Sequence, residues 1–473
     1  MYIQVLLIIK QNKTNFKSKL LNLRSVKNRK RQLMNIFWFR RDLRLEDNAG
    51  LYHALKSGQS VLPLFIFDKN ILDQLDDRHD ARVNFIYNTI QTLHQQLQKL
   101  DSSILIKYGN PIEVWKELAQ EYPIKTVYTN RDYEPYAKKR DAEIKNILTS
   151  QNIDFQTFKD HVIFENEEVT KNDGGTYTVF TPYSKKWRAK LATRLIADNT
   201  SFYFQSYPTQ QYFQHFYKTP PLPLLPLAEM NFKPSTIEIP SKTVAQKIIK
   251  NYDKTRDFPA IAGTSKLGIH FRFGTISIRE KARKAEKLNA TYLSELIWRD
   301  FYAQILDHFP HVVHNAFRAK YERIPWRTSK ADFEKWQKGQ TGYPIVDAGM
   351  RELNATGYMH NRVRMVVASF LTKHLLLDWR WGEAYFAQKL LDFDLASNNG
   401  GWQWAAGCGT DAAPYFRIFN PTSQMKKFDK ELIYIKKWVP EFGTFQYPQP
   451  MVDHKAARVR CLETYKEALA NPI

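Results

Sequence analysis

In the first third of the chain, short apolar runs alternate with longer amphipathic stretches. Five runs have the apolar character of buried strands, at 35–39 (NIFWF), 61–67 (VLPLFIF), 103–109 (SILIKYG), 125–129 (KTVYT) and 154–158 (DFQTF). The segments between them, 47–58, 81–100, 111–120 and 135–150, have helical spacing, and Pro111 stands at a first helical position. This strict alternation predicts a parallel, doubly wound α/β sheet covered on both faces, in a Rossmann-like arrangement.

The pattern changes beyond this α/β domain, which we place at residues 34–164. Residues 165–233 contain a glycine pair, aromatic clusters and the run PPLPLLP, which are typical of a long interdomain linker. Helical spacing dominates residues 234–473 and predicts an all-α domain. No GxGxxG follows the first strand, so the usual dinucleotide fingerprint is absent from the α/β domain.

The net charge indicates a polyanionic partner. The chain of 473 residues carries +22, and nucleic acid is the commonest partner of so basic a protein. Residues 1–33 hold nine Lys or Arg and no acid, and we interpret them as a disordered basic arm or a misassigned start, with Met34 as the true beginning. Without these residues the chain keeps an excess of 13 positive charges, so the basic character does not depend on them.

The cysteine content and the apolar segments indicate in which cellular compartment the protein is expected. The chain has two cysteines, Cys408 and Cys461, which give neither a disulfide framework nor a cysteine-based metal site, and we expect no metal. The run VLLII at 5–9 is too short to cross a bilayer, and lysines follow it instead of preceding it as they do in a signal peptide. We therefore expect a cytoplasmic monomer without a membrane partner.

One turn and one helical segment of the second domain contain residues that could bind a ligand, and each also has an ordinary structural explanation. The turn GTSKLG at 263–268 could present backbone N–H groups and hydroxyls to an anion, although an ordinary helix-capping turn fits it too. In ELIWRDFY, Glu295 and Arg299 stand four residues apart, which also suits an intrahelical ion pair.

Two further segments add arginines, acids, amides and indoles. HNRVRM at 360–365 puts Arg362 and Arg364 on different faces of one helix, so one could bind phosphate while the other turns inward; two solvated arginines are the alternative. The stretch 392–404, DFDLASNNGGWQW, crowds two acids, two amides, two glycines and two indoles together. If it is extended, Asp392 and Asp394 point the same way.

Together and in this order, the segments resemble the photolyase and cryptochrome family. The resemblance runs from Met34 to about Leu469, through IFWFRRDLRLEDN, RDFPAIAGTSKLG, ELIWRDFY, TGYPIVDAGMRELNATGYMHNRVRM, DFDLASNNGGWQWAAGCGTDAAPYFRIFNP and DHKAARV. These long motifs are most similar to those of bacterial class I cyclobutane pyrimidine dimer photolyases. The resemblance implies an α/β antenna domain followed by a helical domain that binds FAD and DNA.

Within that helical domain, the resemblance implies a flavin site. It maps FAD contacts onto Tyr252, Thr264, Ser265, Lys266, Leu267, Gly268, Tyr292, Arg299, Arg364, Asp392 and Asp394, and it places Asn398 opposite flavin N5. An amide can donate or accept a hydrogen bond there without adding charge, which suits the reduced, anionic hydroquinone of an active photolyase. Gly400 and Gly401 are expected to let the backbone pass close to the ring system.

The resemblance also divides the tryptophans by role. Trp402, Trp379 and Trp326 match an electron-transfer chain from the flavin to the surface, while Trp298 and Trp404 match the pair that holds a flipped-out dimer. Further lesion and phosphate contacts map onto Arg256, Glu295, Asn361, Arg362, Met365, Arg417 and Gln424. Arginines neutralise phosphates and indoles give apolar walls for stacking, so the residue types suit these roles.

Two positions depart from the family pattern. Tyr292 stands where many relatives carry Trp, a conservative change that is compatible with FAD. Tyr136 and Ala137 stand where folate-binding relatives carry an Asn-Glu pair, so the carboxylate that partners the pterin ring is missing. A folate antenna, a deazaflavin antenna and the absence of a second chromophore all stay open.

The predicted activity is light-dependent repair of cyclobutane pyrimidine dimers in UV-damaged DNA, by electron transfer from excited reduced FAD to the flipped-out lesion. A cryptochrome-type blue-light photoreceptor is the first alternative, although plant cryptochromes usually carry Asp at the position of Asn398. A (6-4) photolyase is the second, but its helix motif differs from MHNRVRM. A DNA-binding protein without a cofactor would explain the charge and leave the cluster at 392–404 unexplained.

Overall fold

The computed structural model describes residues 33–192 and 201–470, so the predicted basic arm lies, except for Leu33, outside the described residues. Its strands are β1 (Met34–Phe39), β2 (Val61–Asp68), β3 (Leu105–Gly109), β4 (Ile124–Asn130) and β5 (Asp154–Phe158). Neighbouring strands are parallel, and the order across the sheet is β3-β2-β1-β4-β5. The predicted doubly wound sheet and its five strands are confirmed.

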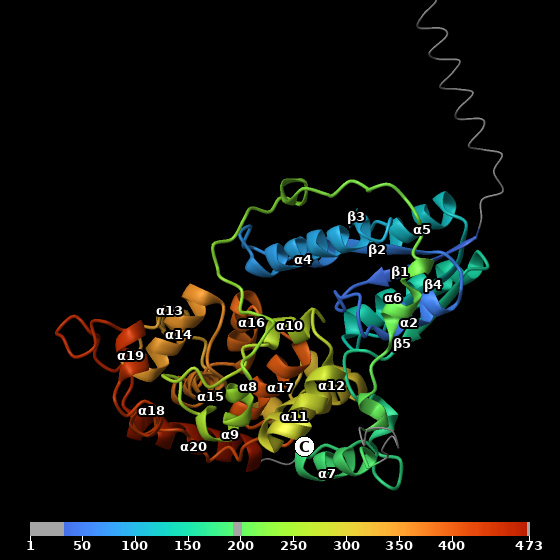
Figure 1. Ribbon diagram of the computed structural model, residues 1–473. Coiled ribbons are helices and arrows are strands. Elements are labelled where there is room, and N and C mark those ends of the chain that lie inside the picture. Colours follow the sequence, from blue (N-terminus) through green and yellow to red (C-terminus); the bar gives the residue numbers. More distant parts are fainter. Residues whose placement is uncertain (1–32, 193–200, 471–473) are drawn as a thin grey trace, which may run out of the picture.

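Helices cover both faces of the sheet because its strands are apolar on both sides (Figure 1). They are α2 (Ala49–Lys56), α4 (Ala81–Gln98), α5 (Pro111–Glu121) and α6 (Pro135–Ser150), beside the short α3 (Lys69–Leu72). In β1, Phe37 and Phe39 enter the core under α2 and α4, whereas Ile36 and Trp38 enter the core under α5 and α6. The four predicted helices are therefore confirmed, with ends shifted by a few residues.

The segment 165–233 contains more structure than a linker requires. Helix α7 (Phe180–Lys190) packs on the helical domain, where the Trp187 indole donates to Asp300 Oδ2 at 3.0 Å. Farther along, the backbone N–H of Tyr217 donates to Val61 O at 2.8 Å, beside the edge of β2. This segment therefore contributes to both cores, and the boundaries drawn at 165 and 233 stay predictions.

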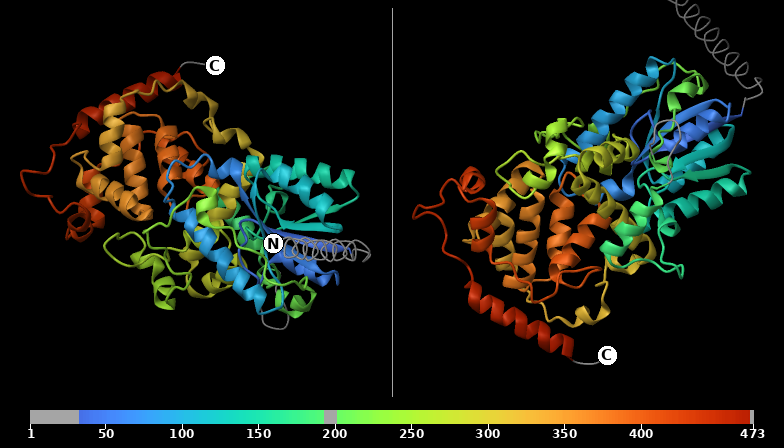
Figure 2. Two further views of the ribbon diagram at one scale, coloured as in Figure 1. Left: turned by 90° about the horizontal axis from the view of Figure 1, so that it is seen from above. Right: turned by 60° about the horizontal axis from the view of Figure 1, so that its bottom comes forward.

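The second domain is helical, as predicted. Its α-helices are α8 (Gln246–Lys250), α9 (Tyr252–Thr255), α10 (Gly268–Arg272), α11 (Ile278–Leu288), α12 (Ala290–His308), α13 (Lys330–Lys338), α14 (Pro344–Thr356), α15 (Asn361–Ser369), α16 (Trp379–Lys389), α17 (Leu395–Ala406), α18 (Pro421–Phe428), α19 (Ile433–Trp438) and α20 (His454–Ala470). Figure 2 shows α20 along the outer edge of this domain, away from the sheet. In the part of the chain that the structure describes, no helix has the length and apolarity needed to cross a membrane.

The motif IFWFRRDLRLEDN forms much of the joint between the two domains. From the carboxyl end of β1, Arg41 reaches Asp394 of the helical domain at 2.7 Å. Farther along the same loop, Asp47 accepts from Arg279 of α11 at 2.8 Å. Arg279 also donates to Asp160 at 2.8 Å, and its side chain is only 6% exposed. Buried arginines paired with carboxylates from the other domain therefore hold the helical domain on the sheet.

This joint predicts a strong stability effect at Arg279. Replacing Arg279 with Met removes the guanidinium and leaves two buried carboxylates short of a partner, which is expected to cost roughly 3–5 kcal/mol of unfolding free energy. Denaturant unfolding measures this loss. Lys284→Met on the same helix is the control, because its ion pair with Glu280 is exposed and is expected to contribute less than about 1 kcal/mol. Equal losses in the two variants would contradict the proposed joint.

Candidate functional site

A cavity of about 410 Å³ lies in the helical domain between α12, α15 and α17. The predicted site residues that line it are Arg256, Glu295, Trp298, Arg299, Asn361, Arg364, Met365, Asp392, Asp394, Asn398, Trp402 and Trp404. Those outside its lining are Tyr252, Thr264, Ser265, Lys266, Leu267, Gly268, Tyr292, Trp326, Arg362, Trp379, Arg417 and Gln424. The fold thus brings half of the predicted site residues to one cavity and leaves the other half outside its lining.

The stretch 392–404 forms one wall of this cavity because α17 begins inside it. The Asp394 carboxylate caps the helix by accepting from the backbone N–H of Ser397 at 3.1 Å and from its hydroxyl at 3.0 Å. From this cap, Ser397, Asn398 and Gly401 turn toward the cavity at helical spacing. The acids, amides and glycines are therefore close in sequence because all of them belong to the first turns of α17 or to the residues just before it, and this segment forms one wall of the cavity.

The two glycines of α17 have different neighbours. A Cβ added to Gly400 would come within 2.3 Å of the Tyr302 ring, so this glycine is needed where α17 packs on α12. A Cβ added to Gly401 would meet no atom within 4 Å. The expectation that both glycines admit the flavin is wrong for Gly400, and only Gly401 faces open space in the cavity.

Asn398 is held by a residue that the sequence did not single out. Its Nδ2 donates to Glu383 Oε1 at 2.8 Å and to the Glu383 carbonyl at 3.1 Å. Both neighbours are hydrogen-bond acceptors, which fixes the amide nitrogen on that side and leaves Oδ1 as the polar atom for the cavity. Burial raises the pKa of Glu383, whose only sequence signal is an acid within the aromatic helix WRWGEAYF. Asn398 is therefore preset as an acceptor.

Arg299 is a buried cation in the cavity wall without a carboxylate partner. Its guanidinium donates to the backbone carbonyls of His161 and, at 3.4 Å, Phe271, and no described carboxylate forms an ion pair with it. Burial lowers the pKa of Arg299. The alternative of an intrahelical pair with Glu295 is wrong, because Glu295 pairs with Arg256 instead. An unneutralised buried arginine suits an anionic group bound in the cavity.

Asp392 and Asp394 both line the cavity but have different partners. Arg364 makes a two-point ion pair with Asp392, at 3.0 and 3.1 Å. Asp394 instead takes Arg41 at 2.7 Å and Arg272 at 3.5 Å. Both oxygens of Asp394 thus already accept hydrogen bonds, from Ser397 at the start of α17 and from the arginines of the domain joint. Asp392 is therefore the better candidate for a direct ligand contact.

The turn 263–268 packs directly behind the Asp392 carboxylate. A Cβ on Gly268 would lie 2.5 Å from the Asp392 side chain, so only glycine allows this approach. Lys266 has a positive φ of 51°, and Thr264 Oγ1 is 3.1 Å from the Tyr358 hydroxyl. The turn is close to the cavity wall although it does not line it, and its role toward an anion stays a prediction.

Trp298 of α12 and Trp404 of α17 both line the cavity, and each lies beside a second aromatic ring. Trp298 stacks on Phe180 with ring centroids 3.7 Å apart and planes 5° from parallel. Trp404 is tilted against Phe419 at 6.4 Å, and Arg417 lies over that phenyl ring. Phe180 belongs to the predicted linker, so sequence reasoning missed it. The two backing rings limit how far either indole can turn.

Two of the three predicted DNA-contacting arginines, Arg256 and Arg362, already have acidic partners. Arg256 pairs with Glu295, while Arg362 donates to Asp257 at 2.8 Å and lies over the Phe428 ring at 4.5 Å. Neither arginine is simply solvated. Arg362 and Arg364 do face different partners, as the helical spacing predicted.

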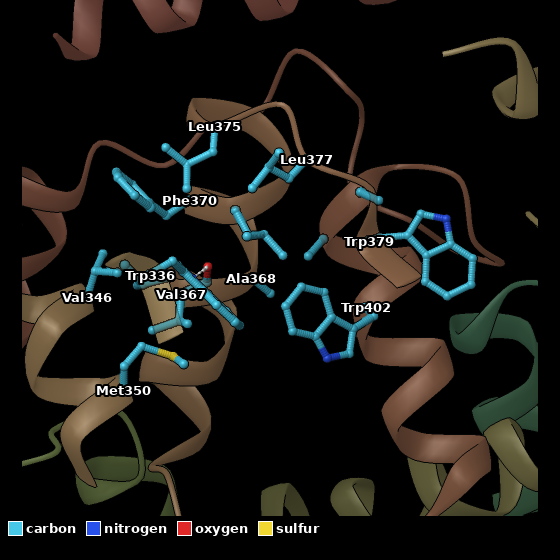
Figure 3. Close-up of a cluster of buried hydrophobic side chains, with 14 of the residues drawn as sticks. Trp336, Val346, Met350, Val367, Ala368, Phe370, Leu375, Leu377, Trp379 and Trp402 are labelled. Atoms are coloured by element: carbon cyan, nitrogen blue, oxygen red, sulfur yellow. Dashed lines mark hydrogen bonds between the residues drawn. The ribbon is translucent and has the colours of Figure 1, made fainter. Parts of the chain in front are cut away.

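The three tryptophans of the predicted electron-transfer chain belong to the largest hydrophobic cluster. Trp402 and Trp379 are each 2% exposed, and Figure 3 shows both rings in the same cluster. Trp326 is partly buried at its edge, beside Tyr465 at 6.0 Å. The partly buried position of Trp326 is therefore consistent with its predicted place at the end of the chain, and its role in electron transfer stays a prediction.

Comparison with known proteins identifies this architecture. Residues 35–200 match the family described as DNA photolyase, and residues 292–446 match the FAD binding domain of DNA photolyase. The deoxyribodipyrimidine photo-lyase of a Synechococcus species is 37% identical over 476 residues, which cover 92% of this chain and 98% of that protein. The chain belongs to the DNA photolyase family.

Solved photolyase structures have the same fold. A bacterial class III photolyase from Agrobacterium tumefaciens superposes with a TM-score of 0.80 and 31% identity, covering 94% of this chain and 100% of that one. An archaeal photolyase from Sulfolobus tokodaii, solved with two FAD molecules, superposes with a TM-score of 0.75 and 32% sequence identity. The match covers 92% of this chain and 100% of that one. The finer assignment of this chain to class I stays a prediction.

FAD is the cofactor of this photolyase domain, and the cavity residues fit it. The unneutralised Arg299 suits the diphosphate, the Asn398 oxygen suits a flavin N–H donor, and the open space at Gly401 leaves room for a flat ring. These three features come from different elements of the wall.

The preset amide predicts an effect of Glu383 on the flavin potential. Glu383→Leu removes the side-chain acceptor that orients Asn398, so the Oδ1 contact with reduced flavin N5–H is expected to weaken. The loss of about one hydrogen bond, ~0.5–1.5 kcal/mol, corresponds to a fall of roughly 20–60 mV in the one-electron potential. Spectroelectrochemical titration measures it. Glu383→Gln keeps an acceptor and is expected to shift the potential less, and an unchanged potential in Glu383→Leu would exclude the orienting role.

Proposed function

We propose that this photolyase-family protein repairs cyclobutane pyrimidine dimers in UV-damaged DNA, using light and reduced FAD. The observation that carries the proposal is one cavity whose walls combine an amide acceptor at Asn398, a buried cation at Arg299 that forms no ion pair with a described carboxylate, and two indoles at Trp298 and Trp404. Its curated relatives carry the name deoxyribodipyrimidine photo-lyase. A cofactor-free DNA-binding protein would not need this arrangement.

Trp298 and Trp404 give the dimer two apolar walls. A base pair must open before a dimer can enter the cavity, and stacking on aromatic rings recovers part of that cost. Because Phe180 and Phe419 back the indoles, the slot between them is preformed and loses little side-chain entropy when the lesion binds. When bound and excited by light, reduced FAD supplies the electron that opens the dimer ring and takes it back afterwards.

Charged residues at the cavity mouth position the DNA. When a phosphate approaches, it would replace Glu295 as a partner of Arg256 and Asp257 as a partner of Arg362. Glu295 lines the cavity and, once released, can accept a hydrogen bond from a thymine N–H. Gln424 Oε1 is buried without a hydrogen-bond partner among the described residues, so the proposed contact with DNA requires this side chain to turn outward.

Trp402, Trp379 and Trp326 are proposed to refill the flavin with electrons when it is oxidised. We further propose that the protein acts as a cytoplasmic monomer, since one chain carries the complete cavity and its two cysteines are free and buried. The antenna site has no assigned chromophore. Tyr136, which replaces the expected amide there, donates its hydroxyl to Asp68 at 2.7 Å.

The repair assay tests the proposal directly. Reduced protein is illuminated with blue light in the presence of DNA that contains cyclobutane dimers, and loss of dimers is followed against a dark control. We expect dimers to disappear only in the light and without net consumption of reductant. Binding of the DNA with no light-dependent loss of dimers would favour the photoreceptor, and loss of (6-4) products instead would favour the other photolyase class.

Trp404 is predicted to contribute lesion affinity rather than stability. Trp404→Ala removes one wall of the slot and is expected to weaken binding of dimer-containing DNA by roughly 1–3 kcal/mol, the range for a lost base–aromatic stack. Trp404→Phe keeps a ring face and is expected to lose less. Fluorescence anisotropy with lesion and undamaged DNA measures both, and FAD absorbance checks that the cofactor site is intact. Equal lesion affinity of Trp404→Ala and the parent would remove Trp404 from the slot.

A further inference from the structure

A second cavity, of about 1420 Å³, lies where the two domains meet and is larger than the cavity of about 410 Å³. Its walls come from α4 of the sheet domain, from residues 206–213, and from residues 242–249 and α11 of the helical domain. Among the predicted site residues, Leu267 and Tyr292 alone line it, and Tyr136 and Ala137 at the predicted folate position do not. This joint cavity is therefore distinct from the flavin cavity and from that folate position.

The lining of the joint cavity carries more bases than acids. The bases are Arg44, Lys99, Lys242, Lys281, Arg283 and Lys284, and the acids are Glu46, Asp47 and Glu280. Arg44 is already paired with Asp160 at 2.7 Å, and Asp47 accepts from Arg279 at 2.8 Å. These two ion pairs belong to the contact between the domains, so the charge that faces the cavity comes mainly from the lysines. A ligand for this cavity is therefore expected to be an anion.

Three of these lysines lie close to one another. Lys281 and Lys284 of α11 both pair with Glu280, and Lys242 forms no ion pair with a described carboxylate. The side chain of Lys281 is 16% exposed, and its amine is 3.7 Å from Glu280. Burial lowers the pKa of Lys281, and the nearby cations Lys284 and Lys242 lower it further. An anionic group bound among the three amines offsets both the desolvation and the mutual repulsion.

Residues 206–213 and α4 give the joint cavity a wall of different chemistry. Tyr207 and Phe213 line it from the first segment, and Phe85 lines it from α4. Aromatic faces of this kind stack on nucleobases. Four glutamines also line the cavity, and none of their side-chain amides is hydrogen-bonded to another described residue: Gln96, Gln210, Gln211 and Gln246. An amide both donates and accepts, as the edge of a base requires.

From these walls we propose that the joint cavity binds a nucleoside polyphosphate. Its phosphates contact Lys242, Lys281 and Lys284, and its base stacks in the part of the cavity lined by Tyr207 and Phe213. The nucleotide touches α4, α11 and the segment between the domains, so it binds the assembled joint and not either domain alone. This site goes beyond the proposed repair of DNA, and the bound nucleotide takes no part in that reaction.

Isothermal titration of the FAD-loaded protein with ATP tests the site, because bound FAD already fills the flavin cavity. Lys281→Met keeps an apolar side chain and removes the amine. It is expected to weaken ATP binding at least about tenfold, as for the loss of one charge-assisted hydrogen bond. Lys287→Met is the matched control and is expected to keep the affinity of the parent, since Lys287 is an exposed lysine of the same helix outside the lining.

Two outcomes of this titration would overturn the site: no binding of ATP by the parent, or equal ATP affinity in Lys281→Met and the parent. If Lys281→Met disturbs the fold, as FAD absorbance and the unfolding midpoint would show, Lys242→Met decides instead. Lys242 is exposed, so its replacement leaves the core intact. It is expected to weaken ATP binding in the same direction, and an unchanged affinity would contradict the proposed phosphate position.

Two further titrations identify the ligand and its place. Inorganic triphosphate carries the phosphates without a base and is expected to bind at least about fivefold more weakly than ATP, because it gains no stacking. Equal affinities would overturn the assignment of a nucleotide. DNA that contains dimers is expected to leave bound ATP in place, whereas displacement of ATP by this DNA would show that both bind at one site and would overturn the separate joint cavity.

Discussion

The site depends on one carboxylate, Asp394. One of its oxygens caps α17 through Ser397, and the other receives Arg41 from the loop after β1. The first contact fixes where the helix begins, and the second fixes that beginning against the carboxyl end of the sheet. Every residue that α17 presents to the cavity, from Asn398 to Trp404, takes its position from this point. Burial opposes ionisation of Asp394, but Arg41 and Arg272 hold the pKa of this carboxyl well below its usual value.

The same joint explains why so basic a protein can bury charge. Arg41, Arg279 and Asp160 are desolvated between the domains, and a buried ion is tolerated only with a well-placed partner. Arg299 is the exception in the cavity wall, since its guanidinium donates to backbone carbonyl groups and forms no ion pair with a described carboxylate. That imbalance supports our proposal that an anionic group of the cofactor binds beside Arg299. The charges that we propose to contact DNA belong to a different class, because Arg256 and Arg362 have the carboxylate partners Glu295 and Asp257, which a phosphate can displace.

The alternating pattern of the first domain predicted its strands, its helices and the parallel direction of its strands closely, because strands buried on both faces are apolar without interruption. The predicted site residues were less complete, since spacing along one helix does not show which residue of another helix lies opposite. Glu383 and Phe180 each act through a contact with a residue of another helix, and neither belongs to a motif. At Gly400 the sequence analysis assigned a ligand role that the structure does not support. A glycine is required there because the Tyr302 ring of α12 lies against it.

The proposed electron-transfer chain differs along its length in how a positive charge on each ring is stabilised. At Trp379 the guanidinium of Arg380 lies over the ring and opposes such a charge, so the route toward Trp326 depends on fast onward transfer. Trp326 is only partly buried, and a ring with more access to water stabilises the charge better. The order of the proposed chain, from buried indoles toward the surface, therefore favours separation of the charge from the flavin.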